Sequence, residues 1–207
     1  MEPNPAGMNE PESNAELLRL NVGCGRDIQA GWVNIDHADL PGVDISFDLE
    51  RCGELRLPFE DDSVGEIRLF HVIEHIHNVL PLMEELYRVA SNGCLCTVRV
   101  PHGASDDAWT DPTHLRPYFR GSFGYFSQPQ YWRADYGYRG DWQPEKILLM
   151  VNQKKFGHMD GKALLYAVSH ERNIVHEIIT ELRAIKPARP QSKEHMTRSE
   201  ITVQMFK

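Results

Sequence analysis

The chain has 207 residues, of which 41% are hydrophobic and 25% charged, and its formal net charge is −8 at pH 7. These fractions are ordinary for a globular protein, and the length suits a single domain with one buried core. The acidic balance argues against a general nucleic-acid or anionic-membrane surface, and no apolar run approaches the length that crosses a bilayer.

The N-terminus is polar and rich in proline and glutamate, and it lacks the basic start and apolar core of a signal peptide. We therefore predict that residues 1–14 are a disordered leader. The four cysteines, Cys24, Cys52, Cys94 and Cys96, do not suggest a disulfide scaffold. The last two share one face of a predicted strand, where a zinc half-site is one reading and small buried thiols are the favoured one. This cysteine usage indicates a reducing compartment, and we expect the cytoplasm.

Two apolar runs near the N-terminus enclose a glycine turn. Residues 18–25 end in Gly23 and Gly25, and residues 32–36 form a second run that ends in Asp36. Because glycine lacks a Cβ, the backbone can bend sharply and a ligand can approach it closely. A carboxylate at the tip of the neighbouring strand accepts hydrogen bonds from ribose hydroxyls. The pattern predicts a cofactor that contains a nucleoside.

The spacing of this motif bears on which cofactor it binds. The dinucleotide fingerprint requires a third glycine, and Ile28 occupies that position. Only ten residues separate Gly25 from Asp36, whereas a dinucleotide fold places the acid about twenty residues on. A nicotinamide oxidoreductase is therefore disfavoured. A cofactor without a pyrophosphate has less need of a helix N-terminus aimed at it, and S-adenosylmethionine is such a cofactor.

The later part of the chain alternates strands with helices, which is typical of an α/β fold. Residues 79–89 place apolar side chains at helical spacing, and Pro101 stops a preceding apolar run. The predicted elements, in chain order, are strands over 45–49 and 64–70, a helix over 79–89, a strand over 94–101, a helix over 163–170, and strands over 175–185 and 200–206.

The order of these motifs resembles the class I S-adenosylmethionine-dependent methyltransferases, in their broad small-molecule subgroup. Asn-x-Gly-Cys-Gly stands at residues 21–25, Gly-Trp-x-Asn-x-Asp at 31–36 and His-Val-x-Glu-His at 71–75. Each motif is weak alone, but their order and spacing together are specific. The resemblance covers residues 17–101 well, and residues 162–207 only as a strand pattern.

The resemblance implies a Rossmann-like fold with a mostly parallel, seven-stranded sheet. Its last two strands, 175–185 and 200–206, would pair antiparallel at the C-terminal edge. We expect a single domain over residues 15–207, with residues 102–160 as an aromatic lid inserted after the fifth strand.

The resemblance also implies a set of cofactor contacts. The glycines would lie near the amino-acid tail of S-adenosylmethionine, and Asp36 would bind the ribose hydroxyls. Asp48 and Leu49 would lie near the adenine, and His71 near the methionine part. The predicted cofactor-binding residues are Asn21, Gly23, Cys24, Gly25, Asp36, His37, Asp48, Leu49 and His71.

Residues 102–160 hold most of the aromatic side chains, interleaved with arginines. The segment starts at the sheet edge where open α/β sheets bind ligands. One interpretation is a lid that supplies an acceptor pocket, and the other is an aromatic subcore that holds a long loop in place. Stacking of unpaired nucleic-acid bases is less consistent with the acidic net charge.

Methyl transfer to a hydroxyl requires alignment and removal of a proton. His114 is the predicted base, because histidine titrates near neutral pH, and Asp111 would orient it. In the alternative, Asp111 caps a helix that begins at Pro112. His102 is a second candidate base, and His71 is the third predicted catalytic residue.

Residues 71–75 also match the His-x-x-Glu-His pattern of one zinc-protease class. That pattern requires a helix, and His71 ends a predicted strand, so we reject a protease. A divalent ion on His71, Glu74 and His75 stays open beside the interpretation in which Glu74 and His75 begin the next helix. We assign no metal ligand.

The sequence thus predicts a cytoplasmic S-adenosylmethionine-dependent methyltransferase that acts on oxygen or nitrogen of a small polar acceptor, with no nucleic-acid or membrane partner. The alternative is a catalytically inactive S-adenosylmethionine-binding partner or sensor protein. It would keep Gly23, Gly25 and Asp36 but lack an open acceptor pocket.

Overall fold

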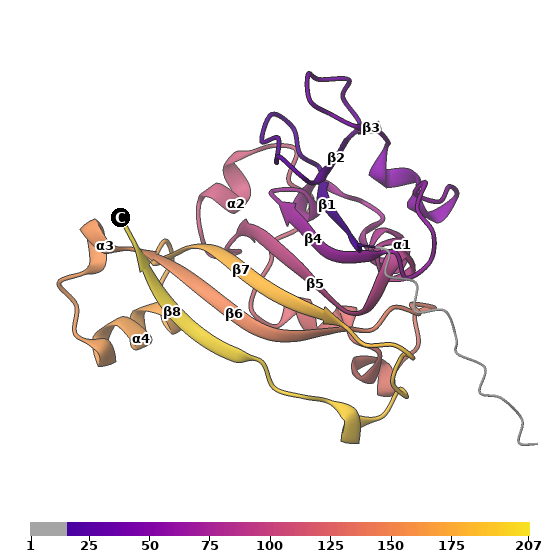
Figure 1. Ribbon diagram of the computed structural model, residues 1–207. Coiled ribbons are helices and arrows are strands. Elements are labelled where there is room, and N and C mark those ends of the chain that lie inside the picture. The colour runs from indigo at the N-terminus through magenta and orange to yellow at the C-terminus, as the bar shows by residue number, and fades with distance from the viewer. Residues whose placement is uncertain (1–15) are drawn as a thin grey trace, which may run out of the picture.

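One twisted, eight-stranded sheet organises residues 16–207, the part of the chain that this computed structural model describes (Figure 1). The predicted leader, residues 1–14, lies outside that part. The strand order is β3-β2-β1-β4-β5-β7-β6-β8. The strands are β1 Leu18–Val22, β2 Val33–Asp36, β3 Ile45–Ser46, β4 Val64–Phe70, β5 Ala90–Pro101, β6 Trp142–Asn152, β7 Val175–Ala184 and β8 Glu200–Phe206.

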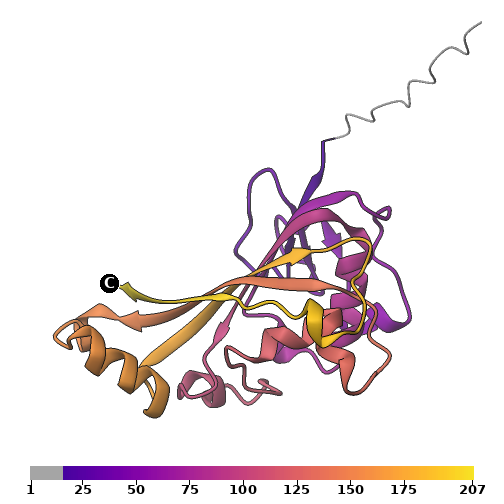
Figure 2. The same ribbon diagram turned by 90° about the horizontal axis from the view of Figure 1, so that it is seen from below.

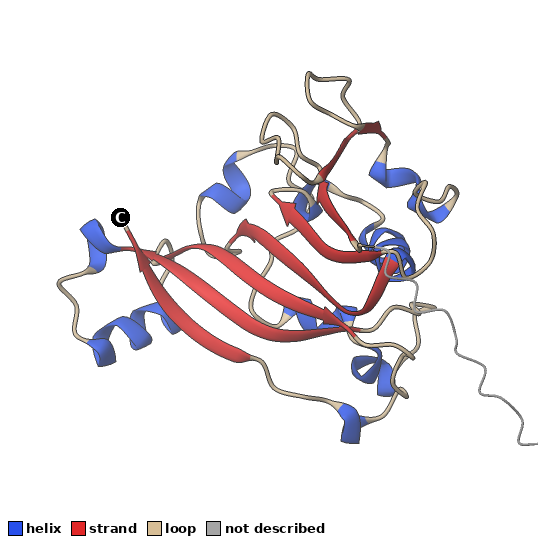
Figure 3. Ribbon diagram, in the orientation of Figure 1, coloured by secondary structure: helices blue, strands red, loops and turns tan. Residues whose placement is uncertain are grey.

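The helices are short and lie in the connections between the strands (Figure 3). The apolar residues at helical spacing in α1 are all buried, which explains why this segment forms a helix against the sheet. They are Val79, Leu82, Met83, Leu86 and Val89. The α-helices are α1 Val79–Val89, α2 Asp107–Thr110, α3 Gln153–Phe156 and α4 Gly161–His170. The 3₁₀ helices are η1 Leu49–Gly53, η2 Ile73–His75, η3 Ser122–Phe126, η4 Gln128–Trp132 and η5 Lys193–His195.

The predicted fold class is confirmed. Strands β3, β2, β1, β4 and β5 pair in parallel, and β7 runs antiparallel to both of its neighbours, β5 and β6. The predicted strand over 64–70, helix over 79–89 and strand over 200–206 have the bounds of β4, α1 and β8. The strand expected over 45–49 is shorter, because the Asp48 side chain caps η1, which begins at Leu49.

The C-terminal edge differs from the expectation. The sheet has eight strands rather than seven, because residues 142–152, assigned to the insertion, form β6 between β7 and β8. Strands β7 and β8 therefore do not pair, and the edge strand β8 runs parallel to β6. The physical reason is that Ile147, Leu149 and Val151 stand at alternate positions, so a strand places these apolar side chains on one face, where they are buried. Figure 2 shows β6 and β7 extending away from β1 to β4, with α3 and α4 at their far end.

The aromatic insertion has a packed interior. Tyr118, Phe123, Tyr131 and Tyr138 are buried and belong to the main hydrophobic core. The Tyr118 hydroxyl donates a 3.1 Å hydrogen bond to the backbone oxygen of Ile73, which fixes the insertion to η2. The aromatic subcore is therefore present, and the lid function stays a prediction.

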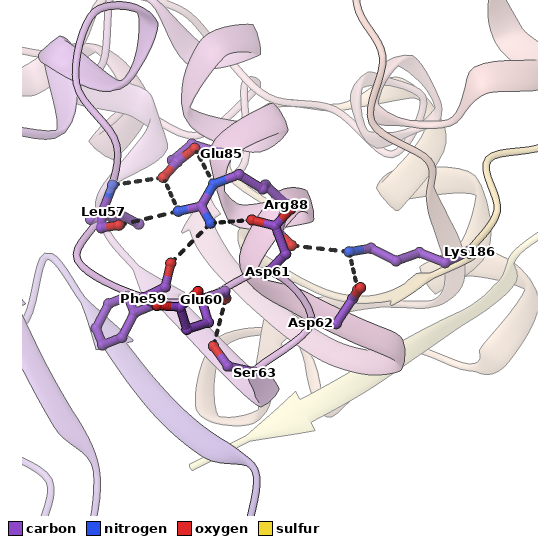
Figure 4. Close-up of polar contacts among 9 residues, drawn as sticks. All are labelled: Leu57, Phe59, Glu60, Asp61, Asp62, Ser63, Glu85, Arg88 and Lys186. Atoms are coloured by element: carbon purple, nitrogen blue, oxygen red, sulfur yellow. Dashed lines mark hydrogen bonds and ion pairs between the residues drawn. The ribbon is translucent and has the colours of Figure 1, made fainter. Parts of the chain in front are cut away.

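Arg88 holds the segment between η1 and β4 against α1 (Figure 4). Its guanidinium bonds both oxygens of Glu85, at 2.7 and 3.0 Å, and Asp61 at 2.6 Å. It also donates to the backbone oxygens of Leu57 and Phe59. Glu85 is only 6% exposed, so Arg88 neutralises a buried carboxylate.

None of the helices in residues 16–207 has the length and apolar character of a membrane span.

Candidate functional site

A cavity of about 320 Å³ opens at the carboxyl ends of β1, β2 and β4, the edge at which open α/β sheets bind ligands. Its volume lies in the range of small-molecule sites. Six of the nine residues predicted to contact a cofactor line it, and they lie at or shortly after the ends of β1, β2, β3 and β4. They are Gly23, Asp36, His37, Asp48, Leu49 and His71.

The glycine turn needs glycine for two different reasons. Gly23 has a φ of +67°, and a Cβ built on it would lie 2.4 Å from Cγ2 of Val72. Gly25 has a φ of +51°, and a Cβ on it would meet no atom within 4 Å. Both positions favour glycine because of their positive φ. At Gly23 a side chain would also collide with Val72, whereas at Gly25 the space beside the main chain is open.

Asp36 connects the tip of β2 to this turn. Its Oδ2 accepts a 2.7 Å hydrogen bond from the Gly25 N–H, and its Oδ1 accepts a 3.0 Å bond from the Ala38 N–H. The Nδ1 atom of the exposed His37 ring lies 3.2 Å from Oδ1. Asp36 is 8% exposed, so one buried carboxylate both shapes the turn and lines the cavity.

Asn21 and Cys24 support the turn from within. The Asn21 amide donates to the Asp27 backbone oxygen at 2.7 Å and to Asn34 Oδ1 at 2.9 Å, and it is 3% exposed. Burial, together with the charge of Asp36, raises the pKa of the Cys24 thiol. Neither residue is among those that line the cavity, and their cofactor contacts stay a prediction.

Two carboxylates close the η1 side of the cavity. The Asp48 Oδ1 atom accepts a 3.1 Å bond from the Glu50 N–H and so caps η1. Glu50, which sequence reasoning missed, accepts the backbone N–H bonds of His77 and Asn78 at 2.7 and 3.2 Å. Burial acts to raise the pKa of Glu50, but these hydrogen bonds outweigh it and lower that pKa. Glu50 thereby fixes η1 to the start of α1.

His71 is a charged wall of the cavity. It follows β4 with a φ of +58°, a region that non-glycine residues rarely adopt. Its Nε2 lies 3.0 Å from Glu177 Oε1, and its Nδ1 lies 3.4 Å from Glu74 Oε1. The contacts with Glu177 and then Glu74 raise the pKa of His71 to about 9. The ring is therefore an imidazolium at neutral pH, which favours an electrostatic role over removal of a proton.

Glu177 reaches this wall from β7, and sequence reasoning missed it. Its Oε2 accepts bonds of 2.9 and 2.5 Å from the Arg99 guanidinium. Burial acts to raise the pKa of Glu177, but the hydrogen bonds from His71 and Arg99 prevail and lower it to about 2. No local sequence pattern indicates this contact, because β7 pairs with β5 only in the folded sheet.

The predicted base, His114, does not line the cavity but contacts His75, which does. The two rings meet edge to face with centroids 4.7 Å apart. Asp111 lies 4.0 Å from His114 Nε2 and follows α2 instead of capping a new helix. Its Oδ1 accepts from the backbone and the hydroxyl of Thr113, and these hydrogen bonds lower the pKa of Asp111.

Three further lining residues were not predicted as contacts: Val72, His75 and Ile76. They belong to the His-Val-x-Glu-His motif and the residue after it, so the motif marked their position but not their role. His102, the second candidate base, lies outside the lining of this cavity, and burial lowers its pKa.

Residues 20–98 match the family described as "Methyltransferase domain". No curated protein matches the chain. Among solved structures, the YcgJ protein of Bacillus subtilis superposes with a TM-score of 0.51 at 13% identity, over 84% of this chain and 94% of that protein. A SAM dependent methyltransferase of Archaeoglobus fulgidus gives 0.50 at 14%, over 81% and 87%. A possible histamine N-methyltransferase of Thermotoga maritima gives 0.51 at 11%, over 81% and 82%. At such identities the structures show the shared fold.

Proposed function

We propose that this chain, whose residues 20–98 match the family described as "Methyltransferase domain", is a class I S-adenosylmethionine-dependent methyltransferase that transfers a methyl group from S-adenosylmethionine to oxygen or nitrogen of a small polar acceptor. The observation that carries the proposal is the cavity at the carboxyl ends of β1, β2 and β4, where the glycine turn and the Asp36 carboxylate form one wall.

The residues present fit S-adenosylmethionine. Gly23 lines the cavity, and Gly25, which lies outside the lining, leaves open space beside the same turn. Each oxygen of Asp36 accepts one backbone N–H bond, and Oδ2 keeps a second lone pair for a ribose hydroxyl, whereas Oδ1 also faces the exposed His37 ring. Asp48 and Glu50 add negative charge to the wall, which suits a cationic sulfonium and the donor groups of an adenosine.

S-adenosylmethionine supplies an activated methyl group when bound. The chain's task is to align the acceptor with it and to exclude water, and alignment alone contributes roughly 7–11 kcal/mol. We assign removal of the acceptor's proton to the cluster of His75, Asp111 and His114, because His75 lines the cavity and the other two adjoin it. A positioned base adds about 10²–10⁴-fold in rate.

Two measurements test this function. Isothermal titration should show that S-adenosylmethionine binds and that Asp36→Ala lowers its affinity at least tenfold. The reason is that each hydrogen bond to a charged group contributes about 1.5–3 kcal/mol. Asp39→Ala is the matched control, because Asp39 is an exposed aspartate close in sequence that does not line the cavity. Unchanged affinity in folded Asp36→Ala protein would contradict the assignment.

Turnover separates an enzyme from a cofactor-binding partner or sensor. Release of S-adenosylhomocysteine should be followed with sugars, quinols and small amines as acceptors. Release with at least one acceptor class supports the enzyme, whereas tight binding without release across the panel supports the sensor.

We propose that the reaction takes place in the cytoplasm and that the methyl acceptor is a small molecule. Within residues 16–207 all four cysteines are free thiols, in keeping with a reducing compartment. The acidic net charge favours a small acceptor over nucleic acid.

A further inference from the structure

Three potential metal ligands meet beside the cavity. Glu74 and His75 belong to η2, and His114 comes from the loop after α2. Each offers a ligand atom, and these atoms all lie within 4.8 Å of one another. A 2.8 Å hydrogen bond from the Leu115 N–H to the Glu74 backbone oxygen fixes the loop to η2, so the tertiary structure holds the three side chains together.

The Glu74 carboxylate lacks a hydrogen-bond partner. Its side chain is 2% exposed, and neither of its oxygens accepts a hydrogen bond from the residues that the structure describes. Such a buried charge is costly unless cations compensate it. The His71 ring compensates part of it, with Nδ1 3.4 Å from Oε1, but Oε2 has no hydrogen-bond donor.

Both histidines have one ring nitrogen fixed as a donor. The His114 Nδ1 lies 3.2 Å from the Ala108 backbone oxygen, which only accepts, so the proton is on Nδ1. The Thr113 hydroxyl donates to Asp111 and therefore accepts from Nδ1 of His75 at 2.9 Å. In the neutral rings each Nε2 then carries a free lone pair. Hydrogen bonds of this kind orient metal-binding histidines in proteins.

We propose that Glu74, His75 and His114 bind a divalent transition-metal ion of the zinc class. Ligand distances of about 2.0–2.2 Å place two ligand atoms roughly 3.4 Å apart around a tetrahedral ion, so small side-chain rotations close the observed cluster. Two imidazoles favour zinc or a similar metal over Mg²⁺ or Ca²⁺, which prefer oxygen ligands. Three protein ligands leave a fourth position open.

The position of His75 suggests what the ion does. His75 is both a proposed ligand and a wall of the cavity, so the ion adjoins the space that an acceptor would enter. An ion there would bind the acceptor oxygen and favour its deprotonated form. Metal-bound His75 and His114 have no free lone pair, so the proton would pass to the Asp111 carboxylate beside His114. This role rests on the proposed function, whereas metal binding itself does not.

Metal binding is tested on the full chain, stripped with a chelator and titrated with Zn²⁺ and with Co²⁺. We expect one ion per chain, with visible Co²⁺ absorption bands. Glu74→Gln and His114→Gln should each lower Zn²⁺ affinity at least tenfold. His158→Gln is the control, because His158 is exposed and lies outside the cluster, and it should bind as the unaltered protein does.

Thr113→Val keeps the proposal testable if the buried substitutions fail to fold. Thr113 is exposed, and its loss removes the hydrogen bond that orients His75, so we expect a 10–100-fold fall in affinity. Stoichiometric binding that these variants do not weaken, or no binding by the unaltered chain, overturns the site. Titration of the metal-free protein with S-adenosylmethionine is a separate readout. Absence of S-adenosylmethionine binding there would count against the proposed function alone.

Discussion

The backbone N–H of Gly25 donates a 2.7 Å hydrogen bond to Oδ2 of Asp36. This bond joins the turn after β1 to the end of the neighbouring strand β2. The carboxylate that we assign to ribose binding therefore also maintains the shape of the turn that the cofactor would approach.

Asp36→Ala should lower the free energy of unfolding by about 2 kcal/mol, because the N–H groups of Gly25 and Ala38 both lose a charged acceptor. Urea denaturation measures the change. The exposed control Asp39→Ala should stay within about 0.5 kcal/mol of the unaltered protein. Equal stability of the two variants would mean that the turn does not depend on this carboxylate.

Gly23→Ala should destabilise the protein by about 3 kcal/mol. The alanine would have to adopt a φ of +67°, which strains its backbone, and its Cβ would lie 2.4 Å from Val72 Cγ2, which adds overpacking. Gly25→Ala shares the unfavourable φ but meets no neighbour, and it should cost only about 1 kcal/mol. Thermal and urea unfolding of both variants compare these costs, and the reverse order would refute the packing argument.

The ion pair of Glu177 should make stability dependent on acid. Its folded-state pKa of about 2 lies below its ordinary value of 4.5, because hydrogen bonds from His71 and Arg99 outweigh burial. The carboxylate therefore stabilises the fold above pH 4.5, and that stabilisation is lost as the pH falls toward 2. It amounts to about 3 kcal/mol at full strength.

Glu177→Gln tests this dependence through urea denaturation at a series of pH values. The stability difference between the variant and the unaltered protein should be constant from pH 7 to pH 5 and should shrink toward pH 3. A difference that stays the same at pH 3 would show that the carboxylate is not ionised through its contacts with His71 and Arg99.

Arg88→Ala should cost about 3–5 kcal/mol, because it leaves the buried Glu85 carboxylate without its cation. Arg51→Ala is the matched control, since Arg51 is half-exposed and its nearest contact with Glu54 is 3.9 Å, and it should cost less than about 0.5 kcal/mol. Chemical denaturation distinguishes the two. Similar losses in both variants would mean that the Arg88 network (Figure 4) adds no more than a surface pair.

The half of the fold that contains β1, β2 and α1 follows from local sequence. Gly23 and Gly25 impose a turn, the apolar spacing of residues 79–89 specifies α1, and Asp36 ends its strand next to that turn. These features act over a few residues, so their chemistry can be interpreted before the chain is folded. The same local reasoning missed Glu50, whose bonds to His77 and Asn78 join segments that are distant in sequence.

The sequence by itself determined the α/β class, the glycine turn and the acid beside it, because strand and helix periodicity and backbone freedom are local properties. Only the tertiary structure decided that β6 enters the sheet between β7 and β8, that Glu177 faces His71, and that His114 stands against His75. Strand pairing and loop packing are set by the burial of whole surfaces, and no short stretch of sequence encodes which surfaces will meet.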